Sequence, residues 1–227
     1  MRPATEGGLR HDGGMATRPP GRSVKIGDDE RTGWSSDRPR RDGAPPRPAD
    51  LTVHCRILRP ADRLRYSPGS LLIVSCASTA ELDSFLDRLV EDRAAVLSLR
   101  KVKALLSGRV GEEELEERAT ELLGAAVAKR LENRETVVLA SEGFTPEERE
   151  PFLRAAAAQK RPRHLILIET GRDQVEEEEL APLNELRRAL DAGELGNEGV
   201  QTALRLGGGS AIEVKRILFR PPPREDD

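Results

Sequence analysis

The segment from Leu71 to Leu86 gathers hydroxyl, thiol and carboxylate side chains where an expected strand meets an expected helix. Such a junction can bind an anion, because the amide groups of a helix N-terminus point at it. However, Ser78 and Glu81 have the spacing of a capping box, which satisfies those amides internally. We favour this structural interpretation over residual anion binding. The candidate residues are Ser75, Cys76, Ala77, Ser78, Thr79, Ala80, Glu81, Leu82 and Asp83.

Cations and further acids near this junction are few. Residues 70–87 contain no Gly, Lys or Arg, and the nearest basic cluster is Arg100, Lys101 and Lys103, after the next expected strand. That cluster could contact a phosphate, although a solvated helix start is the interpretation we favour. Glu142, which follows a further expected strand, is the one acid we retain as a residual candidate.

The elements that would position these residues alternate along the chain. Between the apolar runs lie charged segments with helical spacing, in which Leu82, Phe85, Leu86, Leu89 and Val90 share one face. Alternating strands and helices predict a three-layer α/β fold, with a mainly parallel sheet and helices on both faces. The expected strands are 71–74, 95–97, 136–139, 164–168 and 217–219, with an edge strand within 51–58.

Composition divides the chain into three parts. Residues 1–50 are rich in Gly, Pro and Arg without any periodicity, and we expect a disordered tail, or an extension upstream of a start at Met15. Residues 51–220 are expected to form a single α/β domain, and residues 221–227 a disordered, proline-rich and acidic end.

The charge balance and the cysteines limit the function classes. With 37 Lys+Arg against 40 Asp+Glu, the net charge of -3 argues against nucleic-acid binding through bulk positive charge. No apolar run predicts a membrane span or a secretory signal. Cys55 and Cys76 cannot form a disulfide framework, so the expected compartment is the cytoplasm.

From about residue 70 to residue 220, the order of elements resembles the P-loop kinases of the small, polynucleotide-kinase-like group. Ser78, the helix start Ser84-Phe85-Leu86, Arg130-Leu131 and the segment 136–149 match residues of that group. The resemblance implies an ATP and Mg²⁺ site built by G-x-x-x-x-G-K-S/T. That motif is absent, since alignment on Phe85 places Cys76, Glu81, Leu82 and Asp83 at its four signature positions.

The other groups that the resemblance implies are missing too. Arg100 stands near the expected catalytic Asp, and Leu139 or Ala140 stands where an Asp would hold magnesium. Arg187 and Arg188 lie within the segment 171–205 that would form the lid, although Leu183, Leu186 and Leu190 suit ordinary helix packing equally well.

We therefore expect a non-catalytic, P-loop-kinase-like domain without cofactors, which serves as a binding or regulatory module for an unknown protein partner. One alternative is an ATP- and Mg²⁺-dependent phosphotransferase that uses a displaced lysine, Lys101 or Lys103. A second alternative is a phosphate or nucleic-acid binder that uses Arg100, Lys101, Lys103 and the basic tail.

Overall fold

The computed structural model describes residues 51–171, 174–207 and 209–220. The predictions for residues 1–50 and 221–227 lie outside these ranges. The chain divides after Arg47, and every described element belongs to the part that follows.

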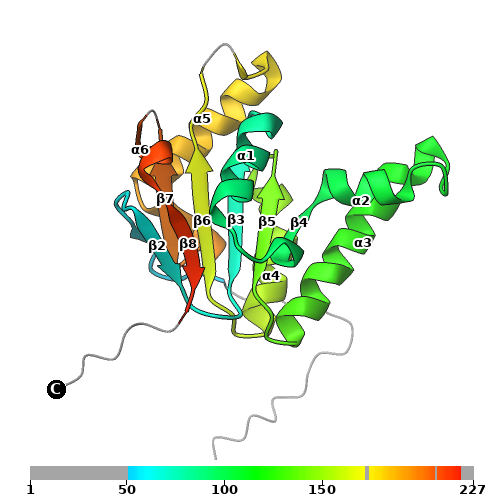
Figure 1. Cartoon of the computed structure of the whole chain (residues 1–227), viewed down its shortest axis with the longest axis horizontal. Coiled ribbons are helices and arrows are strands. Elements are labelled where there is room, and N and C mark those ends of the chain that lie inside the picture. Colours follow the sequence, from blue (N-terminus) through cyan, green and yellow to red (C-terminus); the bar gives the residue numbers. More distant parts are fainter. Residues whose placement is uncertain (1–50, 172–173, 208, 221–227) are drawn as a thin grey trace, which may run out of the picture. The chain divides into compact units, whose positions relative to one another are not determined.

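Six parallel strands form the main sheet in the order β1-β7-β6-β3-β5-β4. Figure 1 shows β3 at the centre of this sheet, between β5 and β6. The three-layer α/β fold expected from the sequence is therefore confirmed. The strands are β1 (Arg56–Ile57), β3 (Leu71–Cys76), β4 (Val96–Ser98), β5 (Val137–Ser141), β6 (Arg163–Ile168) and β7 (Thr202–Leu206).

The direction in which the chain crosses the sheet decides which face each helix covers. Because crossovers between parallel strands are right-handed, a helix changes face when the chain reverses its direction. The step from β3 to β4 runs away from β7, and its helix, α1 (Thr79–Leu89), packs on one face of the sheet. The later steps run the other way, and their helices cover the opposite face: α3 (Glu112–Glu132), α4 (Pro146–Ala158) and α5 (Glu177–Asp191).

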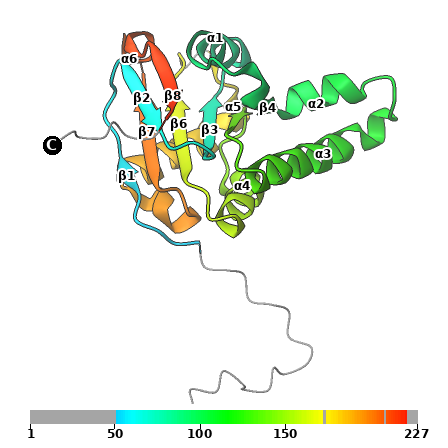
Figure 2. The same cartoon turned by 60° about the horizontal axis from the view of Figure 1, so that its bottom comes forward.

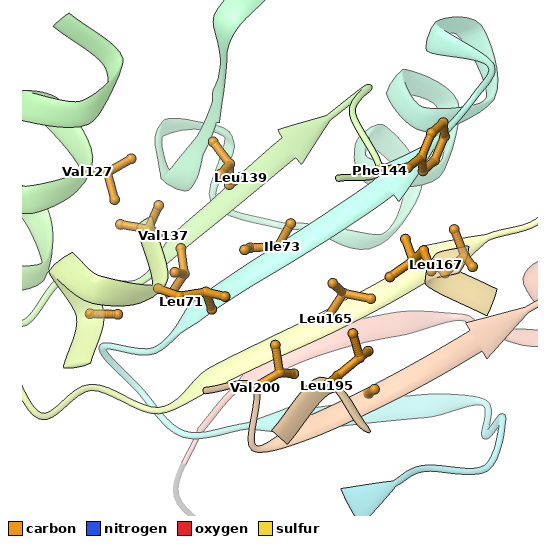
Figure 3. Packing of buried hydrophobic residues seen from close by; sticks show 14 of the residues in the cluster. Leu71, Ile73, Val127, Val137, Leu139, Phe144, Leu165, Leu167, Leu195 and Val200 are labelled. Carbon is orange, nitrogen blue, oxygen red and sulfur yellow. The ribbon is translucent and has the colours of Figure 1, made fainter. Parts of the chain in front are cut away.

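Alternate residues of each central strand enter the two cores. Figure 3 shows Leu71 and Ile73 of β3 beside Val137 and Leu139 of β5, on the face that α3, α4 and α5 cover. Leu72 and Val74 face α1 instead. All six residues of β3 are buried, as a strand covered on both faces requires. The predicted inner face of α1 is confirmed as well, because its apolar residues are buried.

A second, two-stranded sheet completes the layer that contains α1. In it β2 (Arg63–Tyr66) pairs in parallel with β8 (Arg216–Phe219), and α6 (Gly209–Glu213) precedes β8. Leu64 and Tyr66 of β2 and Ile217 of β8 are buried in the same core as α1. The two-stranded sheet thus covers the part of the main sheet's face that α1 does not reach.

Three features differ from the sequence predictions. The run 217–219 is a strand, but it pairs with β2 rather than entering the main sheet. β2 and β7 were not predicted, and β7 lies inside the segment 171–205 that we expected to form a lid. The helical spacing of the apolar residues within 115–131 would also bury Leu122, but this side chain is 47% exposed.

Three further helical elements directly precede or follow β4 and β7. α2 (Leu99–Leu106) follows β4 directly and packs along α3, and Figure 2 shows the two helices side by side beyond the β4 edge of the sheet. A short 3₁₀ helix, η3 (Glu194–Glu198), precedes β7, and another, η1 (Arg93–Ala95), precedes β4. No helix in the described ranges is long and apolar enough to span a membrane.

Candidate functional site: the turn between β3 and α1

The turn between β3 and α1 lies at the point where the strand order changes direction. The chain leaves β3 toward β4 on one side, and it later crosses from β5 to β6 on the other side. In open parallel sheets the carboxyl ends of the strands at such a point form the usual ligand crevice. The structure thus places the predicted junction where an α/β protein most often binds its ligand.

The turn is too short to wrap a phosphate. β3 ends at Cys76 and α1 begins at Thr79, so only Ala77 and Ser78 connect them. A phosphate-binding nest needs successive amides in alternating right- and left-handed conformations. None of residues 75–83, all of which are described, has a positive φ. The backbone therefore lacks both the length and the conformation of a phosphate loop.

One of the first amides of α1, that of Glu81, has a side-chain partner within the protein. Ser78 is the N-cap, and its hydroxyl accepts a hydrogen bond from the Glu81 amide at 3.4 Å. This is the forward half of the predicted capping box, whereas α4 has the complete box between Thr145 and Glu148. An anion at α1 would have to displace a hydroxyl that the sequence itself supplies.

Cys76 is buried at the end of β3. Burial raises the pKa of its thiol to about 11, and the charges of Glu81 and Glu169 add to this, although amide hydrogen bonds from Ser78 and Leu82 act in the opposite direction. A thiol with this pKa is protonated at neutral pH, so Cys76 has no nucleophilic character here.

The remaining residues of the turn point to different surroundings. Ser75 is fully buried and its hydroxyl has no hydrogen-bond partner, while Leu82 belongs to the core beneath α1. Ala80 and Glu81 are exposed. Asp83 and Thr79 lie half-buried and turn toward the ends of β4 and β5, where they meet residues from other elements.

Arg100 from α2 brings together the predicted residues that lie far apart in the sequence. Its guanidinium forms a short contact with the Asp83 carboxylate, and its Nε lies 3.6 Å from Oε1 of Glu142. The Thr79 hydroxyl donates to the same oxygen of Glu142 at 3.1 Å. These four residues, which we call the Arg100 network, link α1, α2 and the end of β5. One guanidinium here serves two carboxylates, so the network carries a net negative charge.

Lys101 and Lys103 do not reach the turn. Lys103 pairs with Glu116 of α3, and Lys101 lies exposed on α2 while its amide binds the N-cap Ser98 at 3.2 Å. In the expected lid, Arg187 pairs with Glu169 and Arg188 with Glu185. Leu183, Leu186 and Leu190 are buried, which agrees with ordinary helix packing.

The two positions at which the resemblance implies a magnesium-binding Asp carry buried apolar side chains. Leu139 and Ala140 are buried in the two opposite cores, so neither position faces the turn. Glu142 is the nearest acid at this strand end, and it is committed to Arg100 and Thr79. Within the described ranges, no group of three or more His, Cys, Asp or Glu side chains could hold a metal ion.

The hollow beside the Arg100 network is acidic. It has a volume of about 420 Å³, and carboxylates from three helices and the end of β5 line it: Glu116, Glu142, Glu148 and Glu179. Burial raises the pKa of Glu179, and the neighbouring charges of Glu176, Glu142 and Glu148 raise it further. The local potential on this side of the turn therefore disfavours an anion.

A larger pocket on the other side of α1 was missed in the sequence. Its volume is about 690 Å³, and it lies between α1, the end of β6 and α6. Glu169 and Thr170 contribute to it directly after β6, and Arg88 contributes from α1. Polar residues that immediately follow a buried strand are a signal that could have pointed to this site.

Comparisons with known proteins add little. No protein-family model matches the chain, and the search of curated proteins finds no significant match. Among solved structures, one that resembles it is named a "putative kinase" from Chloroflexus aurantiacus, with a TM-score of 0.40 and 16% identity, over 62% of this chain and 86% of that chain. A likeness this low carries no argument about function.

Proposed function

We propose that residues 51–220 form a P-loop-kinase-like domain without nucleotide chemistry, which serves as a binding or regulatory module. The observation that carries this proposal is the two-residue connection between Cys76 and Thr79, which leaves no backbone loop to surround a phosphate. The order of elements resembles the kinases, while the part of the fold that would hold ATP is replaced by a tight strand-to-helix turn.

Electrostatics supports the same proposal. A phosphate at the turn would meet Asp83, Glu142 and Glu81, and Arg100, the cation that contacts this group, already binds two of these three carboxylates. One like-charge contact at about 4 Å costs up to about 4 kcal/mol at an effective dielectric constant of about 20. Loss of a charged hydrogen bond adds roughly 1.5–3 kcal/mol. Together these terms would weaken a micromolar site to beyond millimolar.

The test is titration of the full chain with Mg-ATP and Mg-GTP, followed by thermal unfolding and calorimetry. A micromolar site at millimolar nucleotide would stabilise the fold by about 4 kcal/mol, or roughly 8 °C or more in Tm for a chain of this size. We expect no shift. A clear shift with either nucleotide would contradict the proposal, and loss of ATP turnover in Lys101→Ala or Lys103→Ala would instead support the phosphotransferase with a displaced lysine.

One observation favours a second candidate, a binder of phosphate or nucleic acid. Arg100 reaches the turn from α2, and its guanidinium would be free for an anion if its carboxylate partners turned away. The double variant Asp83→Asn with Glu142→Gln removes both partners without removing the cation. Tight, salt-sensitive binding of inorganic pyrophosphate by the wild-type chain would support this candidate. Binding of pyrophosphate by the double variant alone would support the first proposal, in which the carboxylates of Asp83 and Glu142 prevent an anion from binding at the turn.

A further inference from the structure

The pocket between α1, β6 and α6 has the size and the lining of a small-molecule site. Its volume of about 690 Å³ falls within the range of about 300–1,000 Å³ that is usual for such sites. Phe85 and Ile168, each 4% exposed, contribute apolar lining from the core. Ile212 of α6 also lines the pocket and is 77% exposed. An apolar ligand group bound against Ile212 would remove part of this apolar surface from water.

Arg88 fixes one wall of this pocket. Its guanidinium donates to the carbonyl oxygens of Val214 at 2.5 Å and Ala211 at 2.9 Å, which ties α6 and the residue after it to α1. The same guanidinium lies 5.9 Å from the centre of the Phe85 ring. A guanidinium held in one orientation offers a flat face, and aromatic rings stack on such faces.

The uncommitted polar groups of the lining are an acid and a hydroxyl. The Glu81 carboxylate forms no ion pair with any described residue, whereas Glu169 binds both Arg187 and Arg205. The hydroxyl of Thr170 is buried without a hydrogen-bond partner. Glu81 and Ser84 are three residues apart on α1, so both project toward the same side of the helix.

We infer that this pocket binds a flat aromatic molecule that carries an amine, with the ring against Arg88 and Ile212 and the amine at Glu81. The inference rests on the proposed function, since it names a ligand for a module that has no nucleotide. A ring compound that places a negative charge at Glu81 is disfavoured, because the Glu81 carboxylate has no ion-pair partner among the described residues and Arg88, the cation of the lining, is held by two backbone carbonyls.

The experiment compares three probes that share one ring, using the full chain and calorimetry: 2-naphthylmethylamine, 2-naphthylmethanol and 2-naphthoate. The amine binds up to about tenfold more tightly than the alcohol, because Glu81 is exposed and a charge contact at about 4 Å in water contributes about 1 kcal/mol. The naphthoate is the weakest of the three. Glu81→Gln brings the amine to the affinity of the alcohol. An unchanged amine preference in Glu81→Gln, or a preference for naphthoate, overturns the inference.

Location is tested by filling the pocket. Ser84→Trp abolishes binding of the amine, while Ala128→Trp, a matched change at an exposed position of α3 outside the pocket, leaves it unchanged. Should Ser84→Trp not fold, a second pair of variants provides the test. Ile212→Ala is expected to weaken binding of the amine severalfold, whereas Ile57→Ala, at an exposed position of β1, is expected to leave it unchanged. Equal affinities in the pocket variants and their controls, or no binding by any probe at millimolar concentration, overturn the inference.

The same titrations separate the inference from the proposed function. If Mg-ATP binds and displaces the amine, both the proposed function and this inference fail. If Mg-ATP binds elsewhere and the amine is not displaced, the proposed function fails, and the Ser84→Trp result still shows whether the amine binds in this pocket. If neither ligand binds, only the inference fails.

Discussion

Two arginine–carboxylate contacts in this protein use the same chemistry in opposite surroundings. Arg149 of α4 is 2% exposed, donates to both carboxylate oxygens of Glu198 and also binds the Phe144 carbonyl at 2.5 Å. In the Arg100 network, each charged side chain is between 42% and 48% exposed. The first contact holds α4 against η3, and the second lies at the ligand edge of the sheet. The difference indicates that Arg149 is part of the fold, whereas Arg100 is free to exchange partners.

The largest effect is expected at the buried contact. Arg149→Ala leaves Glu198 without its partner and removes the bond to Phe144, so the free energy of unfolding should fall by about 3–5 kcal/mol. Urea denaturation measures this change. Arg188→Ala on α5 is the control, since Arg188 is exposed and its removal should cost less than about 1 kcal/mol. Similar losses in the two variants would show that burial does not distinguish these contacts.

A buried histidine extends the comparison to pH. His164 stacks on Tyr66 with ring centres 4.6 Å apart and bonds Thr202 through Nδ1 at 2.8 Å. Burial, with the charge of Arg163, lowers the pKa of His164 to about 4. The unfolded chain, with a pKa near 6.5, therefore takes up the proton first, and stability falls as the pH drops from about 6.5 to about 4.

The expected loss from His164 is roughly 3 kcal/mol over that pH range. In His164→Gln, which cannot titrate but can still bond Thr202, the dependence of the unfolding free energy on pH between 6.5 and 4 should flatten. Denaturation at a series of pH values provides the measurement. A wild-type curve that stays level across this interval would exclude the buried, neutral histidine.

Glu169 should give an intermediate effect, because it is only partly buried. It lies at the end of β6, 15% exposed, between Arg187 and Arg205. Burial alone raises the pKa of this carboxyl, but hydrogen bonds from the two arginines outweigh it and hold the pKa below its usual value. The stabilisation is thus present above the unfolded pKa, near 4.3, and is lost as the pH falls through the lower, folded pKa.

Glu169→Gln should lower stability at pH 7 by about 1–2 kcal/mol, between the buried and exposed cases. As the pH falls below the unfolded pKa, near 4.3, the variant and the wild type should begin to converge, in contrast to the His164 effect, which begins near pH 6.5. Thermal unfolding at pH 7 and pH 3 tests this. If the difference in stability between Glu169→Gln and the wild type is the same at both pH values, the charge of Glu169 contributes nothing to stability.

The smallest effect belongs to the Arg100 network. Arg100→Ala should change the free energy of unfolding by less than about 1 kcal/mol, because exposed ion pairs contribute little. Urea denaturation in low and high salt measures it, and any effect should shrink as salt screens the pair. A loss as large as that of Arg149→Ala would make this network a structural contact, and the comparison would fail.

Much of the fold was readable from the sequence because its signals are local. The apolar face of α1 follows from periodicity alone and is confirmed, and Thr145-Pro146 is a capping sequence that begins α4 in the structure. β7 was missed because Thr202–Leu206 has few β-branched residues and lay in the segment assigned to a lid, although the flanking glycines mark a strand. β2 alternates buried and exposed residues, but four residues give a weak signal.

The site was only half predictable. The location of the turn follows from the first strand and helix of the alternation, and the position of β3 in the observed strand order agrees with it. The contacts of Arg100 with Asp83 and Glu142 join three distant segments, and no local pattern encodes them. The pocket at Glu81 and Ile212 needed α6 to be placed against α1, which depends on the bonds from Arg88 to two backbone carbonyls.

The pairing of β2 with β8 has a consequence for how this protein is made. β2 leaves the ribosome early, yet its only described strand partner is the last strand to appear, so the apolar side of Leu64 and Tyr66 must wait for Ile217. Until then the sheet surface beside α1 is open to water and to other chains. A chain truncated before Arg216 should thus bind chaperones that recognise apolar surface, whereas the released full chain, in which β8 can pair with β2, should not.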